Sequence, residues 1–249
     1  MRLIQFNLWQ GRLLQPAIRF LEEEKPDIIC LQEVHSSQLD QPMFSFFRSL
    51  EAIREAFPGY HDYYSPVMGF PVAGTLVQTG NAILTRFPIT QARTVFVNGQ
   101  YRSRHQAGDF TPGANLRNVQ VVRLNVNGQQ LTVANHHGYW ERDPMGSDTT
   151  RTKLQLVANE LAKEQEPIIL AGDLNVSYDS PHMEPLQTML YDLIGEHKVK
   201  TTLSILSAVP NDIPCDHIMV SDNLRARKLI VCDDVLASDH LPLILEFDM

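Results

Sequence analysis

Side chains that can bind metals or move protons recur at the ends of apolar runs in this sequence. In residues 167–175 the apolar run closes at Gly172, and Asp173 and Asn175 follow two positions apart. Side chains at positions i and i+2 of an extended chain share a face, so we expect both to reach one small volume. Taken alone, this ending favours a plain polar turn, because Gly, Asp and Asn are common turn formers.

The repetition of this arrangement favours a functional site. The positions that share it are Asn7, Glu33, His137, Asp173 with Asn175, Asp216, and Asp239 with His240. Glu33 is expected to end a buried strand, on the face of Ile29 and Leu31. A carboxylate there is either a surface group or a hard oxygen ligand for Mg²⁺ or Mn²⁺. No His/Cys cluster has zinc spacing, which favours the hard metal.

Two doublets, Asp216-His217 and Asp239-His240, place an acid beside a histidine. Adjacent residues of a strand point to opposite faces, so neither doublet is an internal pair. Histidine takes and gives protons near neutral pH, and a carboxylate on its second nitrogen sets its tautomer. A working Asp–His pair therefore has to be assembled across the fold.

The elements that must position these groups alternate between strands and helices. Strands are expected at residues 2–8, 28–32, 60–64, 82–85, 89–97, 119–126, 130–136, 168–171, 216–220, 227–231 and 241–247, and helices at 15–24, 43–56, 149–163 and 183–190. Asn127-Gly128 predicts an antiparallel hairpin. The pattern predicts an α/β fold in which two mixed β-sheets pack face to face with helices on the outside.

Composition sets the broad class. The 249 residues are 43% hydrophobic, with no linker or repeat, which predicts a single domain over residues 1–249 and, we expect, a monomer. The formal charge of −8 disfavours nonspecific binding of long polyanions but leaves open a phosphate substrate held by a divalent metal. Three cysteines without a disulfide or zinc pattern, no secretory signal and no transmembrane run predict a cytoplasmic protein.

Seven short motifs occur in order between residues 6 and 242. They are Phe6-Asn7-Leu8-Trp9, Leu31-Gln32-Glu33-Val34, residues 80–89, Asn135-His136-His137, Gly172-Asp173-Leu174-Asn175, residues 216–221 and residues 238–242. The series resembles the endonuclease/exonuclease/phosphatase superfamily, with its pancreatic DNase-like fold, and in particular stand-alone domains of the bacterial type whose substrate is unassigned. The resemblance implies a four-layer α/β sandwich and a metal-dependent hydrolase of phosphoester bonds, acting as a phosphodiesterase, nuclease or phosphatase.

The resemblance also implies a metal site. Glu33 is the principal ligand of Mg²⁺, with Mn²⁺ as a second possibility, and Asn7 lies beside it. Asp239 supports the same region.

The catalytic roles follow from the resemblance in the same way. Asp173 orients or activates the attacking water, and Asn175 holds a nonbridging phosphate oxygen. His240 is the catalytic histidine and Asp216 its orienting carboxylate. His137 stabilises the phosphate or assists the leaving group. His137 is assigned this role in place of His136 because the family pattern is Asn, any residue, then His, which matches Asn135 and His137.

Substrate choice depends on aromatic and basic residues near these motifs. Trp9 stands where abasic-site endonucleases and tyrosyl-DNA phosphodiesterases carry an acid, which disfavours those subfamilies; it is either core or a stacking surface. Arg102 and Arg104 lie in a polar segment, residues 99–115, and Arg117 follows it; the three are candidate phosphate ligands, or parts of a solvated loop. Trp140 follows His137 and is a candidate for stacking a base or packing a lipid.

The substrate classes left open are nucleic acid, nucleotide, phospholipid head group and sugar phosphate. The alternative is a non-catalytic binding module that retains the fold. Loss of Glu33, Asp173 or His240 would be typical of such a module, and all three are present.

Overall fold

Two mixed β-sheets form the centre of the protein. The structure is a computed structural model, and it describes residues 1–103, 115–165, 167–209 and 212–249. In spatial order the first sheet contains β12 (Arg225–Val231), β13 (Leu243–Asp248), β1 (Arg2–Asn7), β2 (Ile28–Ser36), β4 (Thr75–Thr85), β3 (His61–Val72) and β6 (Arg102–Ser103). The second contains β10 (Tyr191–Asp192), β11 (Asp216–Val220), β9 (Ile168–Asp173), β8 (Gln129–His136), β7 (Arg117–Val126) and β5 (Ile89–Asn98).

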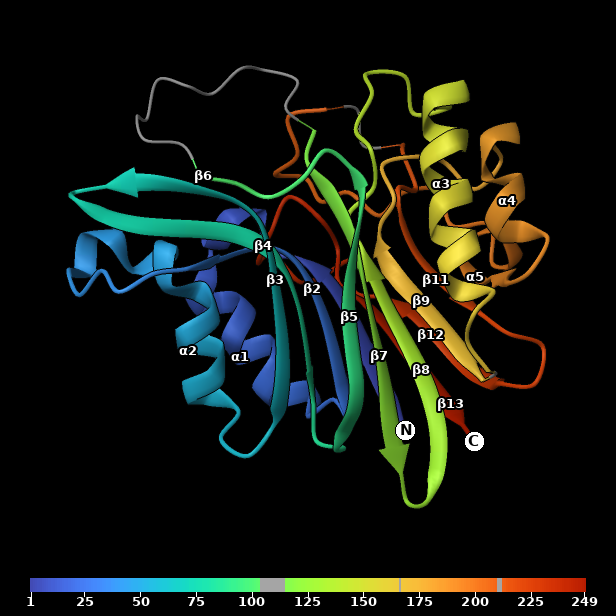
Figure 1. Cartoon of the computed structure of the whole chain (residues 1–249), viewed down its shortest axis with the longest axis horizontal. Helices are drawn as coiled ribbons and strands as arrows, with labels where there is room; N and C mark the ends of the chain where they lie inside the picture. Colours follow the sequence, from blue (N-terminus) through green and yellow to red (C-terminus); the bar gives the residue numbers. More distant parts are fainter. Residues whose placement is uncertain (104–114, 166, 210–211) are drawn as a thin grey trace.

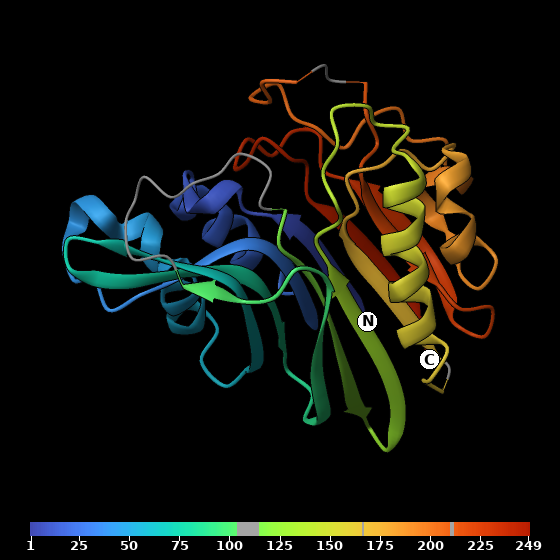
Figure 2. The ribbon, with the colours of Figure 1, turned by 45° about the horizontal axis from the view of Figure 1, so that its top comes forward.

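Helices cover the outer faces of both sheets (Figure 1). The α-helices are α1 (Leu14–Glu24), α2 (Ser49–Ala56), α3 (Asp148–Leu161), α4 (Glu184–Gln187) and α5 (Leu193–Glu196), and the 3₁₀ helices are η1 (Trp9–Gly11), η2 (Pro42–Arg48) and η3 (Pro181–Met183). Figure 2 shows α3 along the outer face of the second sheet, and α1 and α2 lie outside the first. The predicted layered α/β sandwich is confirmed.

Three apolar clusters hold these layers together. Between the sheets, Leu3, Cys30 and Leu245 pack with Val133 and Ile169. A second cluster joins the outer face of the first sheet to α1 and α2, and a third joins the outer face of the second sheet to α3. Strands covered on both faces are apolar on both faces, which explains the continuous apolar runs in the sequence.

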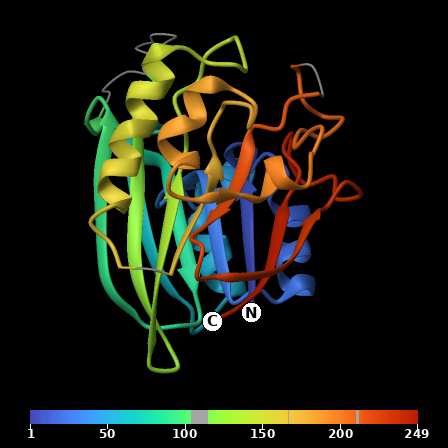
Figure 3. The same cartoon turned by 90° about the vertical axis from the view of Figure 1, so that its right-hand side faces the viewer.

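The termini lie side by side at one edge of the molecule (Figure 3). The amino group of Met1 donates to the carbonyl oxygen of Phe247 at 2.7 Å, and β1 pairs antiparallel with β13. None of the helices in the described ranges has the length and apolar character that crossing a bilayer requires.

Two pairs of parallel strands bring the polar strand ends together. β1 pairs in parallel with β2 in the first sheet, and β8 with β9 in the second. The carboxyl ends of parallel neighbours meet at one edge of a sheet, and the two edges here face each other. The hairpin predicted at Asn127-Gly128 is confirmed, with Val126 opposite Gln129.

The prediction of one helix over residues 43–56 is wrong for its first half. Phe44 has φ −111°, and the chain forms η2 before α2 begins at Ser49. The reason is packing: Phe44 and Phe47 join a small cluster with Phe70 under the β3–β4 hairpin instead of continuing one helical stripe.

The β3–β4 hairpin is longer than its expected strands, 60–64 and 82–85. Its register continues to Val72 opposite Thr75, and Ala73 and Gly74 have positive φ of 47° and 78° in the turn. Two prolines and a glycine in β3 hide the strand pattern in the sequence.

Candidate active site

A direct hydrogen bond between strand ends joins the two sheets at the rim. The Nδ2 atom of Asn7, at the end of β1, donates to Oδ2 of Asp173, at the end of β9, at 3.0 Å. Asn7 is 1% exposed and Asp173 is 2% exposed. The structure therefore brings together two side chains that are far apart in the sequence.

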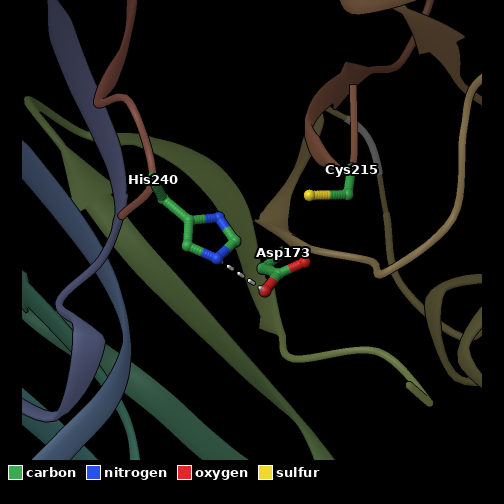
Figure 4. A group of neighbouring side chains, drawn as sticks. All are labelled: Asp173, Cys215 and His240. Atoms are coloured by element: carbon green, nitrogen blue, oxygen red, sulfur yellow. Dashed lines mark ion pairs between the residues drawn. The ribbon is translucent and has the colours of Figure 1, made fainter. Parts of the chain in front are cut away.

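His240 forms the assembled Asp–His pair. Its Nδ1 donates to Oδ2 of Asp216 at 2.8 Å, and its Nε2 lies 3.7 Å from Oδ2 of Asp173. Figure 4 shows His240 turned toward Asp173 from the loop before β13. The neighbour of Asp216, His217, points away and binds Asp192 at 3.0 Å, as opposite faces of a strand require.

The two carboxylates control the charge of the site. Burial alone lowers the pKa of His240, but Asp216 and Asp173 outweigh it and raise that pKa well above the ordinary value. Burial raises the pKa of Asp173 to about 6, and the positive charge of His240 opposes this rise. A protonated His240 therefore lies between two carboxylates at neutral pH.

Asp216 is held by residues on two further elements. Gln5 donates to its Oδ1 at 2.9 Å, and the hydroxyl of Thr202 donates to its Oδ2 at 2.6 Å. Leu203 forms a β-bridge with His240, so the segment that supplies Thr202 also positions the histidine. The carboxylate and the ring are thus fixed by the same segment.

Glu33 reaches the rim by a route that the sequence did not predict. The strand does not end there: β2 continues to Ser36 across a bulge, and Glu33 has φ 56° within it. Ile29 and Leu31 face the helices. A bulge interrupts the alternation of side chains, so Glu33 leaves their face and turns to the site.

The Glu33 carboxylate fits a divalent cation. Its Oε2 is buried and has no hydrogen-bond partner among the described residues. Burial raises the pKa of Glu33; nearby His240 and Asn7 oppose this rise, and Asp239 adds to it. A buried carboxylate with one unpartnered oxygen, beside an amide and a second carboxylate, provides the oxygen donors that Mg²⁺ and Mn²⁺ prefer.

Asn175 lies close to Asp173 through a turn, so the expected extended geometry is wrong. Asn175 has φ 56°, its backbone N–H donates to Oδ1 of Asp173 at 3.0 Å, and its Nδ2 donates to the carbonyl oxygen of Gly138 at 3.2 Å. Gly172 permits the adjoining close approach, because a Cβ there would lie 1.9 Å from the carbonyl oxygen of His136.

The two histidines at the end of β8, His136 in the strand and His137 just after it, differ in environment. The Nε2 of His137 lies 3.5 Å from Oδ2 of Asp173, whereas Nδ1 of His136 binds the carbonyl oxygen of Asn118 at 2.8 Å. Burial, together with Arg117 and His240, lowers the pKa of His137 well below its ordinary value. His137 is therefore neutral at the site.

Two cavities meet at these residues. A cavity of about 840 Å³ is lined by Asp173, His240 and Trp140 among others, and a smaller one of about 230 Å³ shares Glu33, Arg117 and His137 with it. The shared residues place the polar cluster where the two spaces join.

The candidate substrate residues separate into two groups. Arg117 and Trp140 line the larger cavity, and Trp140 is 53% exposed. Trp9 is half-buried under the guanidinium of Arg12, 4.8 Å above its ring, and does not line either cavity. Arg102 is exposed on β6, away from both linings, and Arg104 lies outside the described residues.

Sequence reasoning missed the groups that support the site. Gln5 donates to Gln32, and Gln32 donates to Asn135, so a chain of buried amides crosses between the sheets to Asp216. The sequence did carry a signal for these groups, because polar residues stand on the inward face of otherwise apolar strands. Cys215 is a free thiol, and its Sγ also donates to Oδ2 of Asp216 at 3.6 Å.

The chain belongs to the Endonuclease/Exonuclease/phosphatase family, whose model matches residues 4–240. A comparison with curated protein sequences gives no match.

Solved structures share the fold over the full length of the chain. An endonuclease/exonuclease/phosphatase from Beutenbergia cavernae is 18% identical, with a TM-score of 0.76, covering 100% of this chain and 71% of that one. The mannosyl-6-phosphatase Bt3783 of Bacteroides thetaiotaomicron is 17% identical, with a TM-score of 0.75 and 100% of both chains covered. TDP2 of D. rerio, complexed with single strand DNA product, is 14% identical, with a TM-score of 0.69, covering 100% of this chain and 99% of that one.

Proposed function

We propose that the protein hydrolyses phosphoesters with the help of a divalent cation. One observation carries the proposal: the series Asp216–His240–Asp173 converges beside Glu33, a buried carboxylate with an unpartnered oxygen. Proton-handling groups and an anionic oxygen donor then share one open cavity. This combination suits water attack on phosphorus.

Glu33 would hold the cation, with Asn7 and Asp239 contributing to the same oxygen-rich region. When bound, Mg²⁺ or Mn²⁺ supplies charge stabilisation for the phosphoryl oxygens and lowers the pKa of bound water. The unpartnered oxygen of Glu33 and its raised pKa support this assignment, because both are relieved by a cation.

Asp173 would receive the proton of the attacking water. Above a pH of about 6 its carboxylate is ionised, and the positive charge of His240 keeps it so. As the new P–O bond forms, the bond to the leaving oxygen breaks, and protonated His240 stabilises the negative charge that develops. The leaving oxygen takes a proton from water in the open cavity.

Asp216 would act as a positioning residue. Its bond to Nδ1 of His240 directs Nε2 toward the reacting group. Asn175, neutral His137 and the cationic Arg117 would contact the nonbridging phosphate oxygens, since all three lie at the larger cavity.

The organic part of the substrate would occupy the larger cavity beside Trp140. The similar structures include a sugar phosphatase and a protein complexed with single-stranded DNA, so sugar phosphates and nucleic-acid ends are the first substrates to test. Nucleotides and phospholipid head groups complete the panel. Three free, buried cysteines suit a reducing compartment such as the cytosol.

The test is hydrolysis of p-nitrophenyl phosphate, bis-p-nitrophenyl phosphate and this panel, with Mg²⁺, with Mn²⁺ and with EDTA. We expect metal-dependent turnover, and His240→Ala and Asp173→Asn each to lose at least about 10² in rate. His197→Ala, at an exposed histidine away from the site, is the matched control. Full activity in either site variant, or in EDTA, would refute the assignment.

A further inference from the structure

Three different donor atoms converge at one end of the active-site cavity. An oxygen of Asp173, a ring nitrogen of His240 and Sγ of Cys215 all lie within 4.8 Å of one another. They come from the end of β9, the loop before β13 and the residue before β11. Figure 4 shows the thiol directed toward the other two side chains.

This donor set differs from the one around Glu33. Thiolate and imidazole ligands select Zn²⁺ and similar cations, whereas carboxylate and amide oxygens select Mg²⁺ and Mn²⁺. A tetrahedral zinc with bonds of about 2.0–2.3 Å separates its ligands by roughly 3.5 Å. Oδ2 of Asp173 and Nε2 of His240 are already 3.7 Å apart.

The surroundings favour such a ligand set. Asp216 binds Nδ1 of His240, which leaves Nε2 for a metal, and carboxylate–histidine–metal arrangements are typical of zinc sites. Cys215 is held near Oδ2 of Asp216 at 3.6 Å and near the hydroxyl of Thr202 at 3.7 Å. All three candidate ligands line the larger cavity, which provides an entry path and an open fourth position.

We propose that Asp173, Cys215 and His240 form a site for a thiophilic divalent cation such as Zn²⁺, and that its occupancy inhibits the enzyme. Inhibition follows because the cation takes the lone pairs of Asp173 and His240. Binding forms Zn–S, Zn–N and Zn–O bonds to Cys215, His240 and the ionised Asp173, breaks the S–H and Nε2–H bonds, and releases both protons to solvent. Burial raises the pKa of Cys215 to about 12, so affinity is expected to rise with pH.

Direct binding is measured with Co²⁺, whose thiolate complexes absorb in the near ultraviolet. We expect the absorption in the wild type, its loss on adding Zn²⁺, and its persistence in excess Mg²⁺. Cys215→Ser should lack the band, and Cys232→Ser, at a buried thiol in another cluster, should retain it. If Cys215→Ser does not fold, Cys215→Ala serves the same purpose. Absence of the band in wild type, or its persistence without Cys215, would overturn the site.

Inhibition rests on the proposed function and is measured separately, with Mg²⁺ and bis-p-nitrophenyl phosphate. Zn²⁺ should inhibit wild type and Cys232→Ser alike, while Cys215→Ser should need at least about tenfold more Zn²⁺ for half-inhibition. Equal inhibition of all three proteins would overturn the inhibitory role. A Cys215-dependent cobalt band without hydrolysis of any substrate would refute the hydrolase alone, and hydrolysis without the band would refute the zinc site alone.

Discussion

Replacing Asp216 by Asn tests the central geometry of the site. Asp216 is fully buried and accepts hydrogen bonds from three nitrogen and oxygen donors, with a longer one from Sγ of Cys215 at 3.6 Å. Gln5 donates to Oδ1 at 2.9 Å, while Thr202 and His240 donate to Oδ2 at 2.6 and 2.8 Å. Asn keeps the shape but offers one oxygen, so its amide group must face a donor in either orientation.

The expected loss follows from this count of donors. A hydrogen bond between charged groups contributes about 1.5–3 kcal/mol, which corresponds to roughly 10- to 10²-fold in rate. Loss of a correctly held acid–base group removes typically about 10²–10⁴. We therefore expect Asp216→Asn to lower kcat by about 10²–10⁴, and to lower the pKa of His240, since Asp216 is a main cause of its rise.

The assay combines steady-state kinetics with NMR titration of the His240 ring. Asp192→Asn is the matched control, because Asp192 holds His217 at 3.0 Å in a buried Asp–His pair outside the site. That variant should keep kcat within about threefold of wild type, a barrier change below about 1 kcal/mol. A kcat for Asp216→Asn in the same range, or an unchanged pKa of His240, would refute the reasoning.

Three further predictions concern stability. Without divalent cations, Glu33→Gln should raise the free energy of unfolding by about 1–3 kcal/mol, because burial disfavours the ionised carboxylate and raises its pKa, whereas the amide is neutral. Activity with Mg²⁺ should fall at least about 10²-fold. Burial lowers the pKa of His136 to about 4, so protons bind the unfolded chain more readily than the folded protein. The free energy of unfolding is therefore unaffected above about pH 6.5 and falls as the pH drops from there toward 4. In urea unfolding, His136 should account for about 2 kcal/mol of lost unfolding free energy at about pH 5, and His136→Asn should lack this contribution. Gly172→Ala should lower the unfolding free energy by several kcal/mol, or prevent folding, because its Cβ would lie 1.9 Å from a carbonyl oxygen.

Each of these has a contrary outcome. A Glu33→Gln protein less stable than wild type in EDTA would contradict the claim that burial of the ionised carboxylate destabilises the metal-free protein. Equal acid sensitivity of wild type and His136→Asn would contradict the buried neutral histidine. Gly195→Ala, where the nearest atom is 3.3 Å away, is the control for Gly172, and equal melting temperatures of the two variants would contradict the close approach.

Local patterns in the sequence predicted much of the fold. The Asn127-Gly128 turn predicts the β7–β8 hairpin because two residues of this type match the twist of paired strands. Apolar runs predict strands covered on both faces. The β3–β4 hairpin and the break at Phe44 were not predictable, because long-range packing under the hairpin decides both.

For the site, the sequence by itself determined which chemistry was available: acids, amides and histidines at strand ends, in the order of one family. It did not determine their partners. His240, and not the adjacent His217, binds Asp216, because this pairing depends on the loop that Leu203 holds against His240. The bulge that turns Glu33 toward the cavity and the approach of Cys215 to Asp173 were likewise decided only by the tertiary structure, since periodicity reports the face of one strand and cannot report what another strand places opposite it.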